Sequence, residues 1–145
     1  MKISRTLTIT TDEFFDYLEN QLLKIANDNL DEEQEAYTNS DIQEGFRIIQ
    51  NRDTDINKVE LLINKYKKGE FYEATASSLT DSYRMSYLIT PKDDNILVDY
   101  EQVNLNNFQA ESKGFFAKLG EALYLSRMSN SLYDVERAVF KARAN

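Results

Sequence analysis

Three carboxylates stand in stretches that the sequence predicts to be extended, and they are the side chains most suited to acid–base chemistry: Glu73, Asp99 and Glu101. A carboxylate buried beside tyrosines has a raised pKa and can act as a general acid or base. Asp99 and Glu101 lie two residues apart, so a regular strand places both on the face opposite Val98 and Tyr100. If Tyr100 faces the interior, both acids face solvent, and we favour that solvated arrangement.

Two other polar clusters have a chemical and a structural interpretation. Three lysines in the range 65–68 surround Tyr66; they could attract an anion such as a phosphorylated sugar, or an acidic partner. A charged strand end that discourages edge pairing is the simpler interpretation. The segment 53–57 (Asp-Thr-Asp-Ile-Asn) resembles the start of a calcium loop, but Lys58 and Asn64 stand where such a loop needs Gly and Glu. We interpret it as a hairpin turn and expect no metal site and no cofactor.

Histidine and cysteine are both absent from the 145 residues. Their absence excludes disulfides, thiolate nucleophiles, cysteine-ligated zinc and the commonest general base near neutral pH. An enzyme built from this chain would have to use carboxylates, Tyr, Lys or Ser. The composition therefore favours a protein that is not an enzyme.

Charge and hydropathy exclude several classes of partner. The net charge of −8 and the pI near 4.6 argue against nucleic acid or an anionic membrane surface, because the field of the protein repels phosphate. No apolar run approaches the roughly 18 residues that a membrane span needs, and the N-terminus lacks a signal-peptide core. We expect a cytoplasmic protein with a single domain over residues 1–145.

Consecutive strands are predicted over the range 59–103. β-branched and aromatic residues alternate with polar ones in four extended runs, centred on 59–63, 71–77, 83–90 and 96–101. Turn signals separate these runs at 68–69, 80–81 and 91–95, which predicts an antiparallel meander. A further extended piece is expected at 46–50.

Two of these strands each present an apolar face that carries phenol groups. The faces consist of Tyr83, Met85 and Tyr87 on one strand and of Ile96, Val98 and Tyr100 on the next. If they point toward a helix, they could line a cavity for an amphipathic ligand. An ordinary filled core with hydroxyl groups at its rim is the simpler alternative.

The N-terminal segment reads as a strand followed directly by a helix. The range 2–10 alternates cleanly except at Arg5, which falls in the apolar phase and lies either at a sheet edge, as we favour, or in a concave interior. Thr10 and Glu13 have the spacing of a capping box, and apolar residues follow at helical spacing to about Asn27. The polar range 28–44 is a second short helix or a long loop.

The C-terminal segment is also predicted to be helical. Apolar residues recur at helical spacing in 115–123, and the stripe restarts as Met128, Leu132, Val135 and Val139, with Phe140 and Ala142 beside it. We expect Leu132, Val135, Val139 and Phe140 to be buried on the sheet. The pattern fits two helices with a break near 129–131 and Ser131 as N-cap, or one long helix whose buried face rotates.

Strand, helical segment, meander and final helix together indicate an α+β fold. The opening run MKISRTLTITTDEFFDYL (1–18) and this order of elements resemble the START/Bet v 1-like (SRPBCC) superfamily, the helix-grip fold. The chain also resembles, more narrowly, a family of uncharacterised bacterial proteins in that superfamily. The matching pieces there are Tyr87–Ile89, Val98–Glu101 and Lys113–Phe116.

The resemblance implies a curved antiparallel sheet of about six to seven strands wrapped around the C-terminal helix, with short helices after the first strand. It also implies an elongated cavity between sheet and helix. Superfamily members bind lipids, sterols, quinones, polyketides or plant hormones there, a few are cyclases or hydrolases, and some assist protein partners.

Our hypothesis is a binding module for an apolar or amphipathic small molecule. The candidate cavity residues are Arg5, Tyr83, Met85, Tyr87, Val98, Tyr100, Leu132, Val135 and Val139. One alternative is a cyclase- or hydrolase-type enzyme that uses a cavity carboxylate and a tyrosine. The other is a regulatory domain, linked to sugar metabolism, that binds an unidentified protein.

Overall fold

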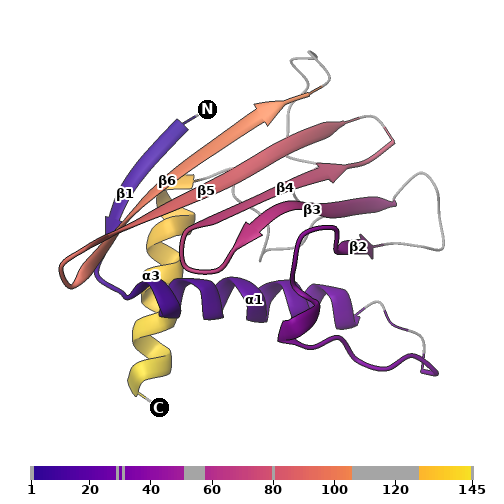
Figure 1. Cartoon of the computed structure of the whole chain (residues 1–145), viewed down its shortest axis with the longest axis horizontal. Coiled ribbons are helices and arrows are strands. Elements are labelled where there is room, and N and C mark those ends of the chain that lie inside the picture. The colour runs from indigo at the N-terminus through magenta and orange to yellow at the C-terminus, as the bar shows by residue number, and fades with distance from the viewer. Residues whose placement is uncertain are drawn as a thin grey trace.

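A curved antiparallel sheet forms the centre of the fold, and helices pack against it (Figure 1). The computed structural model describes residues 2–28, 30, 32–50, 58–79, 81–105 and 128–144. Within these ranges the sheet has six strands in the order β1-β6-β5-β4-β3-β2, and every neighbouring pair is antiparallel. This is the α+β helix-grip architecture that the sequence predicts.

The elements follow each other in the predicted order. They are β1 (Lys2–Leu7), α1 (Thr11–Asp28), the 3-10 turn η1 (Asn39–Asp41), β2 (Arg47–Gln50), β3 (Val59–Lys67), β4 (Phe71–Ser77), β5 (Ser82–Lys92), β6 (Asn95–Asn104) and α3 (Met128–Ala144). The described residues that follow Asp28 in the range 28–44 therefore form a loop with one 3-10 turn. Asn27 holds this loop, because its side-chain oxygen accepts from the Tyr37 amide at 2.8 Å.

The meander is confirmed, and its last turn is shorter than the composition suggested. Gly69, with φ +95°, lies in the β3–β4 turn, where a left-handed backbone favours glycine. The β5–β6 turn consists only of Asp93 and Asp94, because Pro91 and Lys92 still pair with β6. β5 and β6 are thus longer than expected, because the turn was predicted to cover 91–95.

A β-bulge in β3 changes which side chains face the core. The register shifts between Ile63 and Lys65. A regular alternation from Val59 would turn Tyr66 outward, but the extra residue in the bulge reverses the phase and brings Tyr66 to the core face opposite Tyr72.

The first strand, β1, is an edge strand of the described sheet, which is the position that we favoured for Arg5. β1 pairs with β6 alone, and Arg5 lies opposite Val98. Arg5 as a whole is partly buried, and its Nη1 donates to the carbonyl of Ser4 at 2.8 Å. The position of Arg5 on an edge strand of the described sheet is therefore confirmed.

The capping box at the start of α1 is also confirmed. The Thr10 amide donates to Glu13 Oε1 at 2.9 Å, and the Glu13 amide donates to Thr10 Oγ1 at 3.1 Å. Two of the backbone donors that a helix start leaves unpaired are thereby satisfied.

Helix α3 packs on β1 and α1, and only part of its expected stripe is buried. Leu132, Val135 and Val139 are buried, as predicted. Phe140 is 39% exposed, because it lies one residue further around the helix than the buried Val139. The Arg143 guanidinium lies over the Phe140 ring, 5.2 Å from its centroid. Ser131 is not an N-cap, since the helix already begins at Met128.

Several predictions fall outside the described residues. These are the calcium-like segment 53–57, the Lys113–Phe116 match, the apolar stripe at 115–123 and the continuity of the last helix through 126–127. Among the helices that the structure does describe, none combines the length and the apolar character needed to cross a bilayer.

Candidate functional site

Four tyrosines stand in register across the core face of the sheet, one on each of four adjacent strands. Tyr66 pairs with Tyr72, Tyr72 with Tyr87, and Tyr87 with Tyr100. The centroids of successive rings are 6.1, 5.9 and 5.0 Å apart. We call this set the tyrosine row. Each ring pair stabilises the fold by about 0.5–1.5 kcal/mol in addition to the free energy gained from the apolar area that it buries.

Two phenylalanines of α1 cover the tyrosine row. The Phe14 ring lies 5.9 Å from Tyr87, and the Phe15 ring lies 5.9 Å from Tyr66. Both phenylalanines are buried, and they lie on the sheet-facing stripe of α1. The row is therefore the surface on which α1 packs.

The phenols of the row are neutral hydrogen-bonding groups at physiological pH. Burial raises the pKa of Tyr72 and of Tyr100. Burial also raises the pKa of Tyr87, and the nearby phenols of Tyr100, Tyr72 and Tyr17 raise it further.

The hydroxyl groups of the row differ in their partners. Tyr66 donates to Glu19, and Tyr100 donates to Gln102 Oε1 at 2.9 Å. The Tyr72 side chain is buried, at 2% exposure, and its hydroxyl has no hydrogen-bond partner among the described residues. Buried polar groups are nearly always paired, so this one needs an explanation.

A buried glutamate on α1, Glu19, escaped the sequence analysis. It is 3% exposed and accepts from Tyr66, from Asn39 Nδ2 at 2.8 Å and from Lys68 Nζ at 3.5 Å. Burial, and then the bond to Glu19, raise the pKa of Tyr66. With both carboxylate oxygens engaged by donors, Glu19 anchors α1 to β3 and to the η1 loop.

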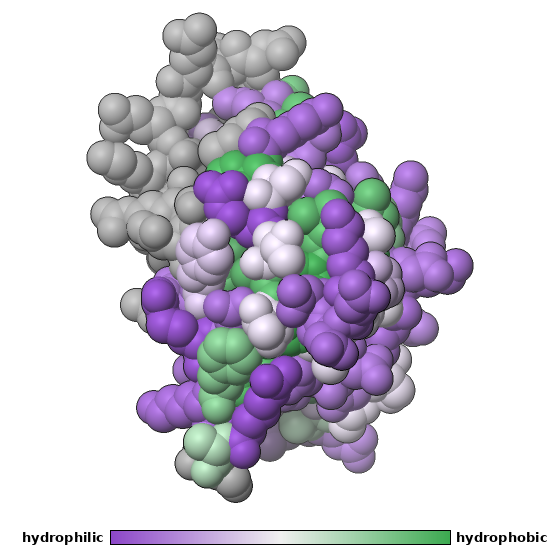
Figure 2. All heavy atoms as spheres, turned by 90° about the vertical axis from the view of Figure 1, so that its left-hand side faces the viewer, coloured by the Kyte–Doolittle hydropathy of each residue, from purple (hydrophilic) through white to green (hydrophobic). Residues whose placement is uncertain are grey.

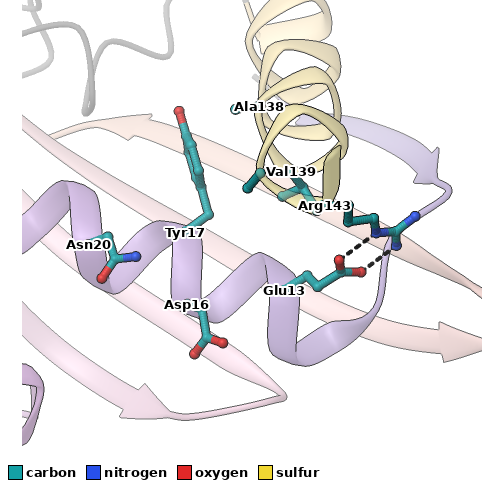
Figure 3. A pocket seen from close by; sticks show the side chains of 8 residues that line it. Glu13, Asp16, Tyr17, Asn20, Ala138, Val139 and Arg143 are labelled. Carbon is teal, nitrogen blue, oxygen red and sulfur yellow. Dashed lines mark hydrogen bonds and ion pairs between the residues drawn. The ribbon is translucent and has the colours of Figure 1, made fainter. Parts of the chain in front are cut away.

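A groove of about 320 Å³ runs between α1 and α3 (Figure 3). Helix α1 contributes Glu13, Asp16 and Tyr17, and helix α3 contributes Ala138, Val139 and Arg143. Figure 3 shows the Tyr17 ring standing beside α3 near Ala138, while Asp16 points the other way. The ring of Tyr17 also packs against the core, so it separates the groove from the interior.

An ion pair closes one end of this α1–α3 groove. Arg143 Nε donates to Glu13 Oε2 at 2.6 Å, and a second bond joins Arg143 Nη2 to Glu13 Oε1. The hydrogen bonds from Arg143 lower the pKa of Glu13 from 4.5 to about 2, with smaller contributions from Thr10. The residue that caps α1 thus also holds the end of α3.

The predicted cavity residues lie on the core side, but only one lines the groove. Seven of them are buried in the core: Tyr83, Met85, Tyr87, Val98, Tyr100, Leu132 and Val135. Val139 is buried and also lines the groove, and Arg5 lies on the edge strand. The residues that the pattern missed are Tyr66 and Tyr72 of the row, Glu19, and the groove residues of α1.

The strand carboxylates lie on the opposite, outer face, as favoured. Lys2 pairs with Glu101 at 3.4 Å, Arg84 with Glu73 at 4.0 Å, and Ser4 donates to Asp99. This position removes all three from the core.

Two of the three lysines near Tyr66 are engaged by acids of the same chain. Lys67 pairs with Glu70 at 3.0 Å, and Lys68 pairs with Asp16 at 3.3 Å. The described residues also bring together no group of acidic side chains suited to holding a metal ion.

The sequence profile of the family described as a domain of unknown function (DUF3284) matches residues 1–136. The chain belongs to the DUF3284 family. No curated protein matches the sequence of this DUF3284 chain significantly.

Solved structures resemble the DUF3284 chain in fold. Ara h 8.0201 superposes with a TM-score of 0.58 at 10% identity, over 97% of each chain. The Aha1 dimer from Colwellia psychrerythraea gives 0.56 at 9% identity, over 96% of each chain. Protein CV1439 from Chromobacterium violaceum gives 0.54 at 10% identity, over 96% of this chain and 95% of that one. These likenesses support the Bet v 1-like helix-grip fold.

Proposed function

We propose that this protein binds a small amphipathic molecule in the α1–α3 groove, and that the ligand reaches the tyrosine row when the Tyr17 side chain, which lies between the groove and the core, moves aside. The observation that carries the proposal is the row itself. Four phenols in register on one sheet face supply a broad apolar surface with hydroxyl groups at fixed spacing, which suits a flat ligand with a few polar atoms.

The shape and chemistry of the groove support a small ligand. Its volume of about 320 Å³ is at the lower end of the range for small-molecule sites. Ala138 and Val139 offer an apolar wall, and the Glu13–Arg143 pair offers a polar end. An amphipathic molecule matches both.

The surface near α3 gives less support to a protein partner. In Figure 2, hydrophilic side chains cover most of the coloured part of the face shown, and the apolar side chains form separate small groups among them. Among the described residues, the large apolar side chains that are exposed lie on β5, in two loops and on α3: Leu88, Leu79 and Leu105, and Tyr133 and Phe140. Single exposed apolar residues are common on the surfaces of monomeric proteins and give little support to a docking surface.

Non-covalent binding fits the site better than acid–base catalysis. The strand carboxylates lie on the outer face, and the buried Glu19 is engaged by Tyr66, Asn39 and Lys68. A general base must be within reach of a substrate proton, whereas the oxygens of Glu19 are already occupied by protein donors.

The test is a binding titration with prodan, a neutral naphthalene dye whose emission shifts to the blue in apolar surroundings. We expect saturable binding with a blue shift, and we expect Ala138→Phe to weaken it because a phenyl group would fill the groove. Ala144→Phe, at an exposed position on the same helix, is the matched control and should bind like the parent. Absence of saturable binding, or equal loss in both variants, would refute the proposal.

A further inference from the structure

The Tyr72 hydroxyl is the polar group of the site that the described protein leaves unsatisfied. Its side chain is 2% exposed, and its oxygen is enclosed without a hydrogen-bond partner. The same chain satisfies the hydroxyls of Tyr66 and Tyr100 with Glu19 and Gln102. An unpaired buried hydroxyl costs stability, and rules of this kind are broken mainly where function requires it.

The position of Tyr72 connects it to the groove. Its ring lies 5.9 Å from the ring of Tyr87, at an interplanar angle of 39°, and the phenols of both Tyr72 and Tyr17 raise the pKa of Tyr87. Tyr17 is half-buried and lines the groove. Because Tyr17 lies between the groove and the core, its side chain must move aside before a ligand in the groove can approach the hydroxyl of Tyr72.

The charges around the site disfavour an ionised ligand. Among the buried side chains that the structure describes, Glu19 alone is charged, and its oxygens are saturated by donors. The cation of the groove, Arg143, is already paired with Glu13, and Asp16 adds a negative charge at the rim. A buried anion would lack a cation, and a buried cation would lack an available carboxylate.

We infer that the ligand is an uncharged molecule with a hydrogen-bond acceptor, of the ketone or quinone type, and that its oxygen pairs with the Tyr72 hydroxyl. The inference rests on the function proposed above and names the ligand class for the same site. Because Tyr72 stays protonated in the core, it donates and the carbonyl accepts. The hydroxyl is thus retained for binding at a cost to the stability of the ligand-free protein.

Calorimetric titration with matched naphthalenes tests the ligand class. The compounds are naphthalene, 2-acetylnaphthalene and 2-naphthoate, which differ in having no acceptor, a neutral acceptor and a charge. We expect the ketone to bind about tenfold tighter than naphthalene, the value of one hydrogen bond to a neutral group, and naphthoate to bind more weakly than naphthalene.

Tyr72→Phe tests the residue, because it removes the oxygen and keeps the ring. We expect it to abolish the preference for the ketone, to leave naphthalene affinity unchanged, and to raise Tm by about 3 °C because a buried unpaired hydroxyl is gone. Tyr133→Phe, at an exposed phenol of α3, is the control and should change neither quantity.

The outcomes separate this inference from the proposed function. Naphthalene binding without a ketone preference, or a preference that survives Tyr72→Phe, overturns the inference and leaves the groove as a binding site. Tightest binding of naphthoate overturns it as well, and so does a lower Tm in Tyr72→Phe, which would mean that the hydroxyl has a structural partner. If none of the three compounds binds, the proposed function fails and the inference falls with it.

Discussion

Replacing Glu19 is the sharpest test of how α1 is held on the sheet. The carboxylate accepts from Tyr66 and from Asn39 Nδ2 at 2.8 Å, so Glu19→Ala leaves two donors without a partner. Hydrogen bonds to a charged group contribute about 1.5–3 kcal/mol each, and Lys68 adds little because its side chain is half exposed. We expect a loss of about 3–5 kcal/mol, because part of each term is recovered when water reaches the donors.

Urea denaturation and thermal melting measure this loss. For a chain of 145 residues, each kcal/mol of lost stability lowers Tm by about 2–4 °C, so Glu19→Ala should melt at least about 6 °C lower. Glu19→Gln keeps one acceptor oxygen and should lose less. Asp16→Ala is the matched control: Asp16 also pairs with Lys68, at 3.3 Å, but it is exposed and should change stability by less than about 0.5 kcal/mol.

A double-mutant cycle identifies the partner. Tyr66→Phe should destabilise the parent but have little further effect in the Glu19→Ala background, because the bond is already lost. If Glu19→Ala matched the control, or if its effect and that of Tyr66→Phe were additive, Glu19 would not be the anchor described here.

Three further predictions concern the Glu13–Arg143 ion pair and two turn residues, Gly69 and Asp93. The pKa of Glu13 is lowered from 4.5 to about 2, so its contribution to stability is present above pH 4.5 and is lost as the pH falls through 2. Urea midpoints measured from pH 5 to pH 2 should therefore fall more steeply for the parent than for Glu13→Gln, and equal slopes would contradict the pair with Arg143. Gly69→Ala should lower the free energy of unfolding by about 1–2 kcal/mol, since φ is +95° there. Asp93→Gly, at φ 54°, should be neutral or stabilising by urea titration; a clear loss would mean that the Asp93 side chain has a role in the turn.

The order of elements could be predicted because it depends on local patterns. The Thr10–Glu13 box and the period-2 strands act over a few residues, and the structure follows them. The outward position of Asp99 and Glu101 follows from the same alternation. Local rules of this kind depend only on sterics and hydrogen bonding within one element.

The site could be predicted only in part because it depends on a bulge and on distant contacts. The bulge after Ile63 reverses the inward–outward alternation of side chains in β3. No residue type in this stretch predicts a bulge, so Tyr66 was not assigned to the core. The groove requires α1 and α3 to cross, with Glu13 and Arg143 separated by 130 residues. Such a juxtaposition is a property of the folded chain.

Glu19 did leave a signal in the sequence. It lies four residues after Phe15 and three before Leu22, in phase with the buried stripe of α1. A charged residue at such a position is either an interruption of the stripe or a buried group with dedicated partners. Phe140 shows the opposite error, since an apolar residue beside the stripe of α3 was expected to be buried and is exposed.

The central claim is that a ligand bound in the α1–α3 groove reaches the tyrosine row past Tyr17, and methyl NMR during a titration with 2-acetylnaphthalene tests it most directly. Val139 lines the groove, Met85 lies on the core face two residues from Tyr87, and Leu88 is exposed on the outer face. We predict that the Val139 and Met85 methyl signals shift together with one dissociation constant while those of Leu88 stay in place. Shifts at Leu88 without shifts at Val139, or no saturable shift at all, would contradict the account.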